Sequence, residues 1–310
     1  MPTVAIAGGA GNLGRTILDA FKESSKHTVI VLVRKESKAQ NLGVPIFHVD
    51  YSNVKSISNV LESNNVDTVI SALSVRSAVE GESETNLARA AANSSPTKRF
   101  IASEYGTRAP TEKDLQLPQH EFREAVMNEL RKTDLEWTRI HNGYFLDYFG
   151  MPHVESHMTP VAFGIDVANK AAAIPGTGED IMSFTYTKDV AKFVVAALDL
   201  PKWDEALYCY GDKTTWNELL SIAEEVRGSK FTVAYDSPEK LAKGEMTELP
   251  SHRYIYPFWP KPMFQEYFAK FGLYVTKGLF DFPEDKTLNK AFPDIKTSKV
   301  RDIVGAWAGK

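Results

Sequence analysis

The stretch that decides the fold is VAIAGGAGNLGRTI, residues 4–17. It begins with four apolar residues, which predict a strand buried on both faces. Glycines then stand at every third position, and apolar residues recur at helical spacing after them. Bare backbone between a buried strand and a helix start lets a chain approach the pyrophosphate of a dinucleotide, while the helix N-terminus faces the negative charge. The stretch therefore predicts a nucleotide-binding turn formed by Gly8, Gly11, Asn12, Leu13 and Gly14.

Composition and charge are those of an enzyme-sized globular protein. Of the 310 residues, 43% are hydrophobic and 25% are charged, which is ordinary for a folded chain. The formal net charge of −4 argues against nucleic acid as a main partner. The single cysteine, Cys209, excludes an internal disulfide or a cysteine-based metal site and fits a reducing compartment. No apolar run approaches the ~20 residues of a membrane span, and the first strand leaves no room for a secretory signal, so we expect a cytoplasmic protein.

Strands and helices alternate through about the first half of the chain. Apolar runs predict further strands at residues 28–33, 45–49, 67–73, 98–103 and 135–140. Helix-forming composition predicts helices between them, at residues 55–63, 82–93 and 118–132. This alternation predicts an α/β fold with a doubly wound, parallel sheet of the Rossmann type.

The character of the sequence changes after about Gly150, where prolines, glycines and short apolar pieces become frequent. An amphipathic helix follows, with Thr187 as its expected capping residue. We expect a dinucleotide-binding domain over residues 1–150, to which residues 185–212 return. A smaller C-terminal α/β substrate-binding region is expected over residues 151–184 and 213–310.

The end of the second strand bears on the choice of cofactor. About twenty residues past the last glycine of the fingerprint, an acid would bind the ribose 2′-hydroxyl of NAD, whereas an arginine accommodates the 2′-phosphate of NADP. That residue is Arg34, and Lys35 and Lys38 supply further donors nearby. The pattern predicts NADP(H) as cofactor, with a solvated basic loop as the alternative.

Topology predicts further cofactor contacts where the third and fourth strands end. Ligands of open α/β sheets bind at the carboxyl edge of the strands, which places Ser71, Ala72 and Leu73 under the cofactor. Asp50 is predicted beside the adenine or, equally, as a cap of the following turn or helix.

Motifs in order along nearly the whole chain resemble the NmrA-like and isoflavone-reductase-like branch of the atypical short-chain dehydrogenases, in its fungal form. The motifs are GGAGNLG (8–14), VLVR (31–34), KRFIASEYG (98–106), WTRIHNGYF (137–145), IPGTGEDIMSFTYTKDVAKFVVAAL (174–198) and LNKAFPD (288–294). The resemblance implies an NADPH-dependent reductase that transfers a hydride to a carbonyl, imine or conjugated alkene of a small aromatic or polycyclic, secondary-metabolite-like compound. Because the family also includes regulators that bind NADP without turnover, a redox sensor acting through a protein partner is the alternative.

The resemblance also identifies a departure at the catalytic position. Reductases of this branch carry a lysine on the helix after the Ser-Glu-Phe-Gly loop, where this chain has Arg123. An arginine does not readily donate a proton, but it can stabilise a developing enolate or alkoxide. His120, on the same helical face, could supply the proton, and Tyr105 adds a hydroxyl where relatives carry phenylalanine. The alternatives are a solvated His120 and an Arg123 paired with Glu124 or another acid.

The remaining expected contacts lie near the nicotinamide and in the aromatic tail. The resemblance implies that Ser103, Asn142 and Gly143 face the cofactor and that Tyr144 and Phe145 begin the substrate wall. Most tail aromatics have the spacing of a packing face, but a proline-interrupted stretch could form a lid over an apolar pocket. The lid residues would be Tyr254, Tyr256, Phe258 and Trp259.

Overall fold

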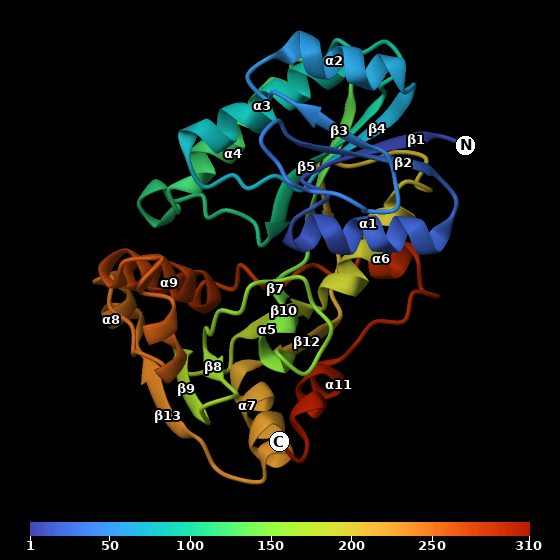
Figure 1. Ribbon diagram of the computed structural model, residues 1–310. Coiled ribbons are helices and arrows are strands. Elements are labelled where there is room, and N and C mark those ends of the chain that lie inside the picture. The colour runs from blue at the N-terminus through green and yellow to red at the C-terminus, as the bar shows by residue number, and fades with distance from the viewer.

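The computed structural model, which describes residues 1–310, has a seven-stranded parallel sheet at the centre of one lobe (Figure 1). The strand order is β11-β6-β5-β4-β1-β2-β3, and each neighbouring pair is parallel. The strands are β1 (Thr3–Ala7), β2 (Thr28–Arg34), β3 (Ile46–Val49), β4 (Val66–Ser71), β5 (Arg99–Gly106), β6 (Glu136–His141) and β11 (Ala206–Tyr208). The expected doubly wound, parallel Rossmann sheet is confirmed.

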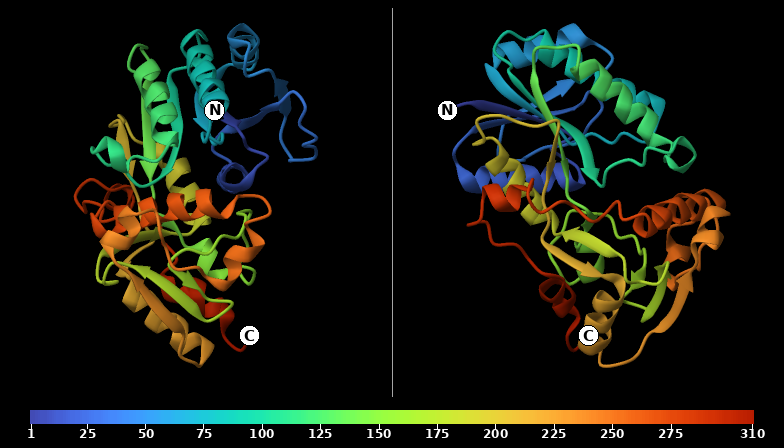
Figure 2. Two further views of the ribbon diagram at one scale, coloured as in Figure 1. Left: turned by 90° about the vertical axis from the view of Figure 1, so that its left-hand side faces the viewer. Right: turned by 180° about the vertical axis from the view of Figure 1, so that it is seen from behind.

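Helices cover both faces of this sheet (Figures 1 and 2). One face carries α1 (Asn12–Ser24) and α6 (Thr187–Ala197), which contact each other. The other carries α2 (Val54–Ser63), α3 (Ala78–Ala92) and α4 (Gln119–Leu130). Each face has its own apolar core, because side chains alternate along buried strands: Ile101 of β5 points to the α1 side and Phe100 to the α3 side.

The second lobe contains two three-stranded sheets around an aromatic core. One has the order β12-β10-β7 and the other β13-β9-β8. Their strands are β7 (Tyr144–Phe145), β8 (Ile165–Asp166), β9 (Ala171–Pro175), β10 (Ile181–Thr185), β12 (Asp212–Thr215) and β13 (Thr232–Asp236). The helices are α5 (Asp147–Gly150), α7 (Trp216–Arg227), α8 (Pro238–Ala242), α9 (Lys261–Thr276) and α11 (Val300–Val304). Trp216, fully buried, contacts Phe149, Phe163 and Phe184 at the centre of this core.

The chain passes between the lobes several times. It leaves the large sheet after β6, returns with α6 and β11, and leaves again at β12. The short helix α10 (Leu288–Ala291) returns once more, since Leu288 packs in the core beside α1 and α6. Trp307, near the end of the chain, belongs to the second core and donates its indole N–H to the carbonyl of Phe149 at 2.8 Å.

The start of α6 differs from the sequence-based expectation. Thr187 is the first helical residue, and Tyr186 occupies the cap position without a side-chain cap. The Thr187 hydroxyl instead donates to the buried Asp147 carboxylate at 2.6 Å, and the Thr187 N–H donates to the same carboxylate at 2.9 Å. A carboxylate from α5 therefore satisfies the helix end, which ties α6 to the second lobe.

No helix in the chain has the length and apolar character that crossing a membrane requires.

Candidate functional site

The glycine turn between β1 and α1 is tightly packed at two of its three glycines. Gly8 has φ +80°, and a Cβ there would lie 2.6 Å from the carbonyl oxygen of Ala72, which follows β4. A Cβ at Gly14 would lie 2.2 Å from the carbonyl oxygen of Gly8. Both positions therefore require glycine for the turn to close. Gly11 differs, since a Cβ there would meet nothing nearer than 3.7 Å, and the space outside it is open.

The first turn of α1 presents free hydrogen-bond donors beside this open space. The N–H groups of Asn12, Leu13 and Gly14 have no hydrogen-bond partner in the protein. No side chain caps the helix, and its first turn carries no acidic residue. Unpaired N–H groups at a helix N-terminus suit an anion such as a phosphate. The turn therefore fits the pyrophosphate of a dinucleotide.

The basic residues after β2 are exposed at the same edge of the sheet. Arg34 ends β2, and Arg34, Lys35 and Lys38 are all solvent-exposed. Asp50, at the end of the neighbouring β3, accepts hydrogen bonds from the Ser52 N–H at 2.9 Å and from the Ser52 hydroxyl at 2.6 Å. These bonds lower the pKa of Asp50. The Asp50 carboxylate therefore acts as a turn cap, one of the two roles considered from the sequence.

The carboxyl ends of β4 and β5 are joined beside the glycine turn. Ser71 is fully buried, and the Ala72 N–H donates to the carbonyl of Ala7 at 2.8 Å. The Ser103 hydroxyl of β5 donates to the carbonyl of Leu73 at 2.7 Å. These bonds hold Ala72 against the turn, so β1, β4 and β5 form one continuous wall.

A β-bulge interrupts the pairing of β5 with β6 at this wall. The register passes from Ala102 opposite Arg139 to Gly106 opposite His141, so β5 has two more residues than β6 in this interval. Glu104, in the bulge, is 2% exposed and accepts from Arg139 at 2.8 Å. Burial opposes its ionisation, but the charges of Arg139 and His141 hold its pKa below the usual value. The bulge turns charged side chains inward and extends β5 beyond its predicted end.

The structure brings two of the three residues predicted to carry the chemistry together on α4, whereas Tyr105 of β5 packs against the core on the α1 side of the sheet. His120 and Arg123 lie on one face of α4, and buried atoms without a hydrogen-bond partner include His120 Nε2, Arg123 Nε and the Tyr105 hydroxyl. Arg123 has no ion-pair partner, because Glu124 pairs instead with Arg131 at 2.8 Å. The alternative in which Glu124 neutralises Arg123 is therefore wrong.

His120 is buried rather than solvated, which corrects the alternative considered from the sequence. It is 7% exposed and stacks on Tyr274 of α9 with ring centroids 6.2 Å apart. Burial, together with the nearby charge of Arg123, lowers its pKa to about 4. At neutral pH the ring is uncharged, so it can form a hydrogen bond but does not carry a proton in excess.

The turn after β6 leads the chain into the second lobe. The N–H groups of Asn142 and Gly143 both donate to the carbonyl of Gly106 at 2.9 Å. Gly143 has φ +72°, and a Cβ there would lie 1.9 Å from the carbonyl oxygen of Ser183. Asn142 is fully buried; its Nδ2 donates to the carbonyl of Gly143 at 3.3 Å, and its Oδ1 has no hydrogen-bond partner.

The aromatic residues predicted around the substrate occupy different environments. Tyr144 is 6% exposed and packs among the core aromatics, while Phe145 is half-buried. Tyr254 and Phe258 are 62% and 89% exposed. Tyr256 and Trp259 pack against Phe264, which is fully buried in α9, with centroids 5.8 and 5.4 Å apart.

Side chains of helix α9 are hydrogen-bonded to the segment that leads into α4. The Tyr274 hydroxyl donates to the carbonyl of Leu115 and accepts from the Leu117 N–H, both at 3.0 Å. Gln119 donates to the Tyr267 hydroxyl at 3.0 Å. The second lobe therefore holds the segment that positions His120 and Arg123.

Sequence reasoning missed the buried acid of α3. Glu84 is 1% exposed and accepts from the Ser103 N–H at 2.7 Å. A signal was present, because Glu84 shares helical spacing with Leu87, Ala88 and Ala91, all of which are fully buried. An acid on the apolar face of a helix indicates a buried polar contact.

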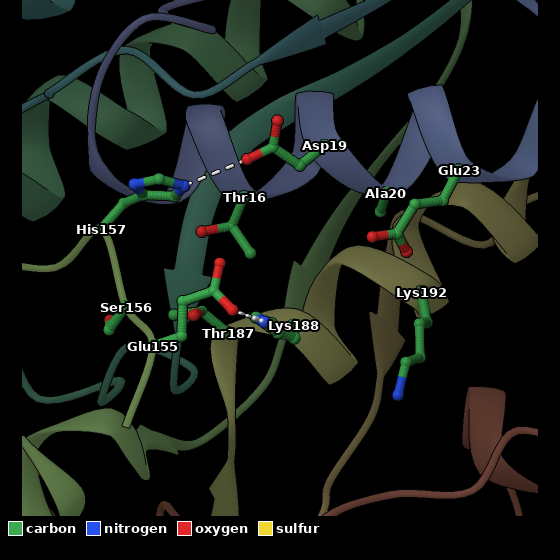
Figure 3. Close-up of a pocket in the computed structure, with 10 residues that line it drawn as sticks. All are labelled: Thr16, Asp19, Ala20, Glu23, Glu155, Ser156, His157, Thr187, Lys188 and Lys192. Atoms are coloured by element: carbon green, nitrogen blue, oxygen red, sulfur yellow. Dashed lines mark hydrogen bonds and ion pairs between the residues drawn. The ribbon is translucent and has the colours of Figure 1, made fainter. Parts of the chain in front are cut away.

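A separate polar pocket lies between α1, α6 and residues 155–157 (Figure 3). Its walls carry both charge signs, which are paired across it: His157 contacts Asp19 at 3.1 Å and Lys188 contacts Glu155 at 2.6 Å. None of the predicted site residues lines it. This pocket is a junction between the lobes, distinct from the edge with the glycine turn.

Comparison with known proteins agrees with this arrangement. A model of the NmrA-like family matches residues 2–269. Oxidoreductase BOA1 of Botryotinia fuckeliana is 38% identical over 258 residues, which cover 83% of this chain and 84% of the relative. Oxidoreductase swnN of Metarhizium robertsii is 34% identical over 329 residues, covering 98% and 96%. The solved structure of AtPrR2 with NADP⁺ and (+)pinoresinol has a TM-score of 0.77 at 21% identity and covers 99% of both chains.

Proposed function

Because this chain belongs to the NmrA-like family and is an oxidoreductase, we propose that it is an NADPH-dependent reductase of small aromatic or polycyclic compounds. The reducible group would be a carbonyl, an imine or a conjugated alkene. The observation that carries the proposal is the open space at Gly11 beside three unpaired N–H groups. This edge of the sheet is where a dinucleotide phosphate would be neutralised by backbone dipoles.

We propose that NADP(H) is held by the edge formed from β1, β2, β4 and β5. The glycine turn with Asn12 and Leu13 would bind the pyrophosphate, and Arg34 with its neighbouring lysines the 2′-phosphate. Ser71, Ala72, Leu73 and Ser103 would line the wall, with Asn142 and Gly143 beyond them. When bound, the cofactor supplies the hydride.

Arg123 is proposed to stabilise the negative charge that develops on the substrate. Its Nε is buried and unpaired, so its charge and donors are not consumed by a protein carboxylate. A fixed cation in a partly dry site costs little reorganisation as charge develops. Since His120 is neutral at pH 7, the proton that completes the reduction would come from water or from Tyr105.

An aromatic substrate class is supported by the second lobe. AtPrR2, whose fold is similar, has been solved with pinoresinol. In this chain residues 151–184 and 213–310 would supply the substrate side, while residues 1–150 and 185–212 supply the cofactor side. Tyr254 and Phe258, exposed between the prolines, would be the outer part of the substrate wall.

Titration of cofactor fluorescence tests the binding half of this function. NADPH is expected to bind at least about tenfold more tightly than NADH, since one charge-assisted phosphate contact contributes about 1.5 to 3 kcal/mol. The Arg34→Ala variant should lose most of this preference. Arg253→Ala, in the second lobe, is the matched control and should keep it. Equal affinities for the two cofactors in the unmodified protein would contradict the assignment of Arg34.

A panel of enones, imines and ketones tests the catalytic half and separates it from the second candidate, a redox sensor. The sensor is favoured by the arginine at the position where reductases of the family carry lysine. NADPH oxidation with any member of the panel supports the reductase. Tight NADPH binding with no turnover across the panel would instead support the sensor.

A further inference from the structure

The β-bulge of β5 is fixed from outside the sheet by an acid. The Ser103 N–H lies where β5 has left the register of β4, whose last partner on β5 is Ile101. Glu84 Oε1 accepts from this N–H at 2.7 Å. The Ser103 hydroxyl in turn holds the carbonyl of Leu73. Through these two bonds Glu84 supports the wall beside the glycine turn.

The other oxygen of this acid has no partner. Glu84 Oε2 is buried without a hydrogen bond, and so is Arg123 Nε on the neighbouring helix α4. Helices α3 and α4 pack directly together, since a Cβ at Gly81 would lie 2.7 Å from Phe122 Cβ. The charge of Arg123 favours the ionised form of Glu84. An unpaired acid oxygen and an unpaired guanidinium nitrogen therefore lie in one buried cluster.

The charged and titratable groups that face Glu84 come from two elements. Glu104 and Tyr105 belong to β5, and Arg123 belongs to α4. Glu104 disfavours ionisation of Glu84, but its own charge is held by Arg139. From β4 the neighbouring side chain is Ser71, which does not titrate near neutral pH.

Glu84 differs from the other titratable groups of the cluster in the pH at which it exchanges a proton. Burial raises its pKa to about 7, against the Ser103 hydrogen bond, the Ser71 hydroxyl and the Arg123 charge. Burial lowers the pKa of both His120 and His141 to about 4. Burial also raises the pKa of the Tyr105 phenol far from neutrality. Within this cluster, Glu84 is the group placed to change charge under physiological conditions.

We propose that Glu84 is a positioning residue for Arg123. A protonated Glu84 leaves the charge of Arg123 free for the substrate, whereas an ionised Glu84 offsets part of that charge. The inference rests on the proposed function, in which Arg123 stabilises negative charge on the substrate. Loss of the Glu84 proton to solvent creates a buried carboxylate whose negative charge acts on the nearby Arg123 guanidinium and offsets part of its charge. The arginine then stabilises the substrate less, so the protonated form is the active one.

Nuclear magnetic resonance on the protein without cofactor tests the proton and its effect on Arg123. In protein labelled with ¹³C-glutamate, one side-chain carboxyl signal should titrate near pH 7, and Glu84→Gln should remove it. In ¹⁵N-arginine protein, the Arg123 Nε–H signal, identified by its loss in Arg123→Lys, should shift with the same midpoint. It should not shift in this range in Glu84→Gln. A Glu84 signal that titrates near the ordinary glutamate value, or an unresponsive Arg123, would overturn the proposal.

The turnover of a substrate found in the panel gives the second readout. The kcat of the unmodified protein should fall about tenfold per pH unit above pH 7, as for one deprotonation. Glu84→Gln keeps an oxygen for the Ser103 N–H, so we expect it to fold and to hold kcat within about twofold across that range. Glu82→Gln, exposed on the same helix, is the matched control and should retain the fall. Identical pH profiles for Glu84→Gln and the unmodified protein would also overturn the proposal.

These readouts distinguish failure of the proposed function from failure of the proposed coupling between Glu84 and Arg123. A protein that binds neither NADPH nor NADH, yet shows the Glu84 and Arg123 titrations, would contradict the proposed function and retain the coupling of the two residues. A protein that reduces a substrate without those titrations would retain the function and reject the coupling. If Glu84→Gln does not fold, the two titrations in the unmodified protein still decide.

Discussion

Gly11 is the residue at which cofactor binding and folding can be separated. A side chain at Gly8 or Gly14 would collide with backbone, but a side chain at Gly11 would enter open space. Replacing Gly11 therefore fills the proposed phosphate site without disturbing the core.

We expect Gly11→Val to fold with a thermal midpoint within a few degrees of the unmodified protein and to lose NADPH binding by at least about a hundredfold. The reason is that the branched side chain would occupy the volume of the phosphate beside the α1 N-terminus. Circular dichroism and fluorescence titration measure the two effects. Gly14→Val is the contrasting variant, which should destabilise the protein by about 1–3 kcal/mol or more because it overpacks the turn. A folded Gly11→Val that binds NADPH normally would disprove the phosphate assignment.

Arg123 is the residue on which the proposed chemistry depends. Loss of a charge-stabilising donor typically lowers turnover by about 10² to 10³. Arg123→Ala should therefore reduce kcat at least about a hundredfold while NADPH affinity changes less than about threefold. Arg131→Ala, which removes an exposed arginine paired with Glu124, is the control. Near-normal turnover of Arg123→Ala would mean that this arginine is structural.

At the scale of elements, α9 and the segment before α4 act together. The Tyr274 hydroxyl satisfies the carbonyl of Leu115 and the N–H of Leu117 at once. Tyr274→Phe would leave both backbone groups without this partner, at an expected loss of about 1–3 kcal/mol in the free energy of unfolding. Because the segment positions His120 and Arg123, the KM for substrate should also rise. Urea unfolding and steady-state kinetics measure these effects, with Tyr235→Phe, at an exposed tyrosine of β13, as a control that should change neither.

The elements themselves show what local sequence can and cannot predict. Strand β1 and helix α1 follow from apolar runs and helical spacing, which are local properties. The extension of β5 to Gly106 passes through a bulge that leaves no periodic signal and at which the Ser103 N–H is bonded to Glu84, nineteen positions earlier. Thr187 looked like a cap because its residue type favours one, but Asp147, forty positions earlier, takes its hydroxyl and N–H. Contacts between distant segments decided both cases.

Individual site residues likewise divide into those that local sequence predicts and those that depend on contacts with distant segments. The glycine turn was predictable because tight turns need glycine whatever surrounds them. The state of His120 was not, since its burial comes from Tyr274 on a helix formed more than a hundred residues later. Tyr144 is likewise a residue of a type that suits either a pocket wall or a core, and only its packed aromatic neighbours place it in the core.

At the scale of the whole molecule, buried histidines make stability depend on pH. The folded pKa of His120 is about 4 and its ordinary value is 6.5, so the unfolded chain binds the proton first. The stability that this neutral histidine contributes is present above pH 6.5 and is lost as pH falls toward 4. His141 acts in the same direction, whereas Glu84 acts oppositely between its ordinary value and about 7.

The His120→Gln variant separates the effect of His120 on the pH dependence of stability from the effects of His141 and Glu84. Between pH 6.5 and pH 4, the free energy of unfolding of the unmodified protein should fall relative to that of His120→Gln by about 3 kcal/mol. Urea titrations at several pH values measure this difference. A constant difference between the unmodified protein and His120→Gln would show that the ring is not held neutral.

The repeated passage of the chain between the lobes has a consequence for how the protein is made. Multidomain chains usually fold one domain at a time as they leave the ribosome. Here the large sheet is incomplete until β11 has been made, and the core beside α1 is incomplete until Leu288 has been made. The second core is incomplete until Trp307 has been made. Each lobe is therefore completed only after segments distant in the sequence have been made, and until then the nascent chain exposes apolar surface that chaperones would need to shield.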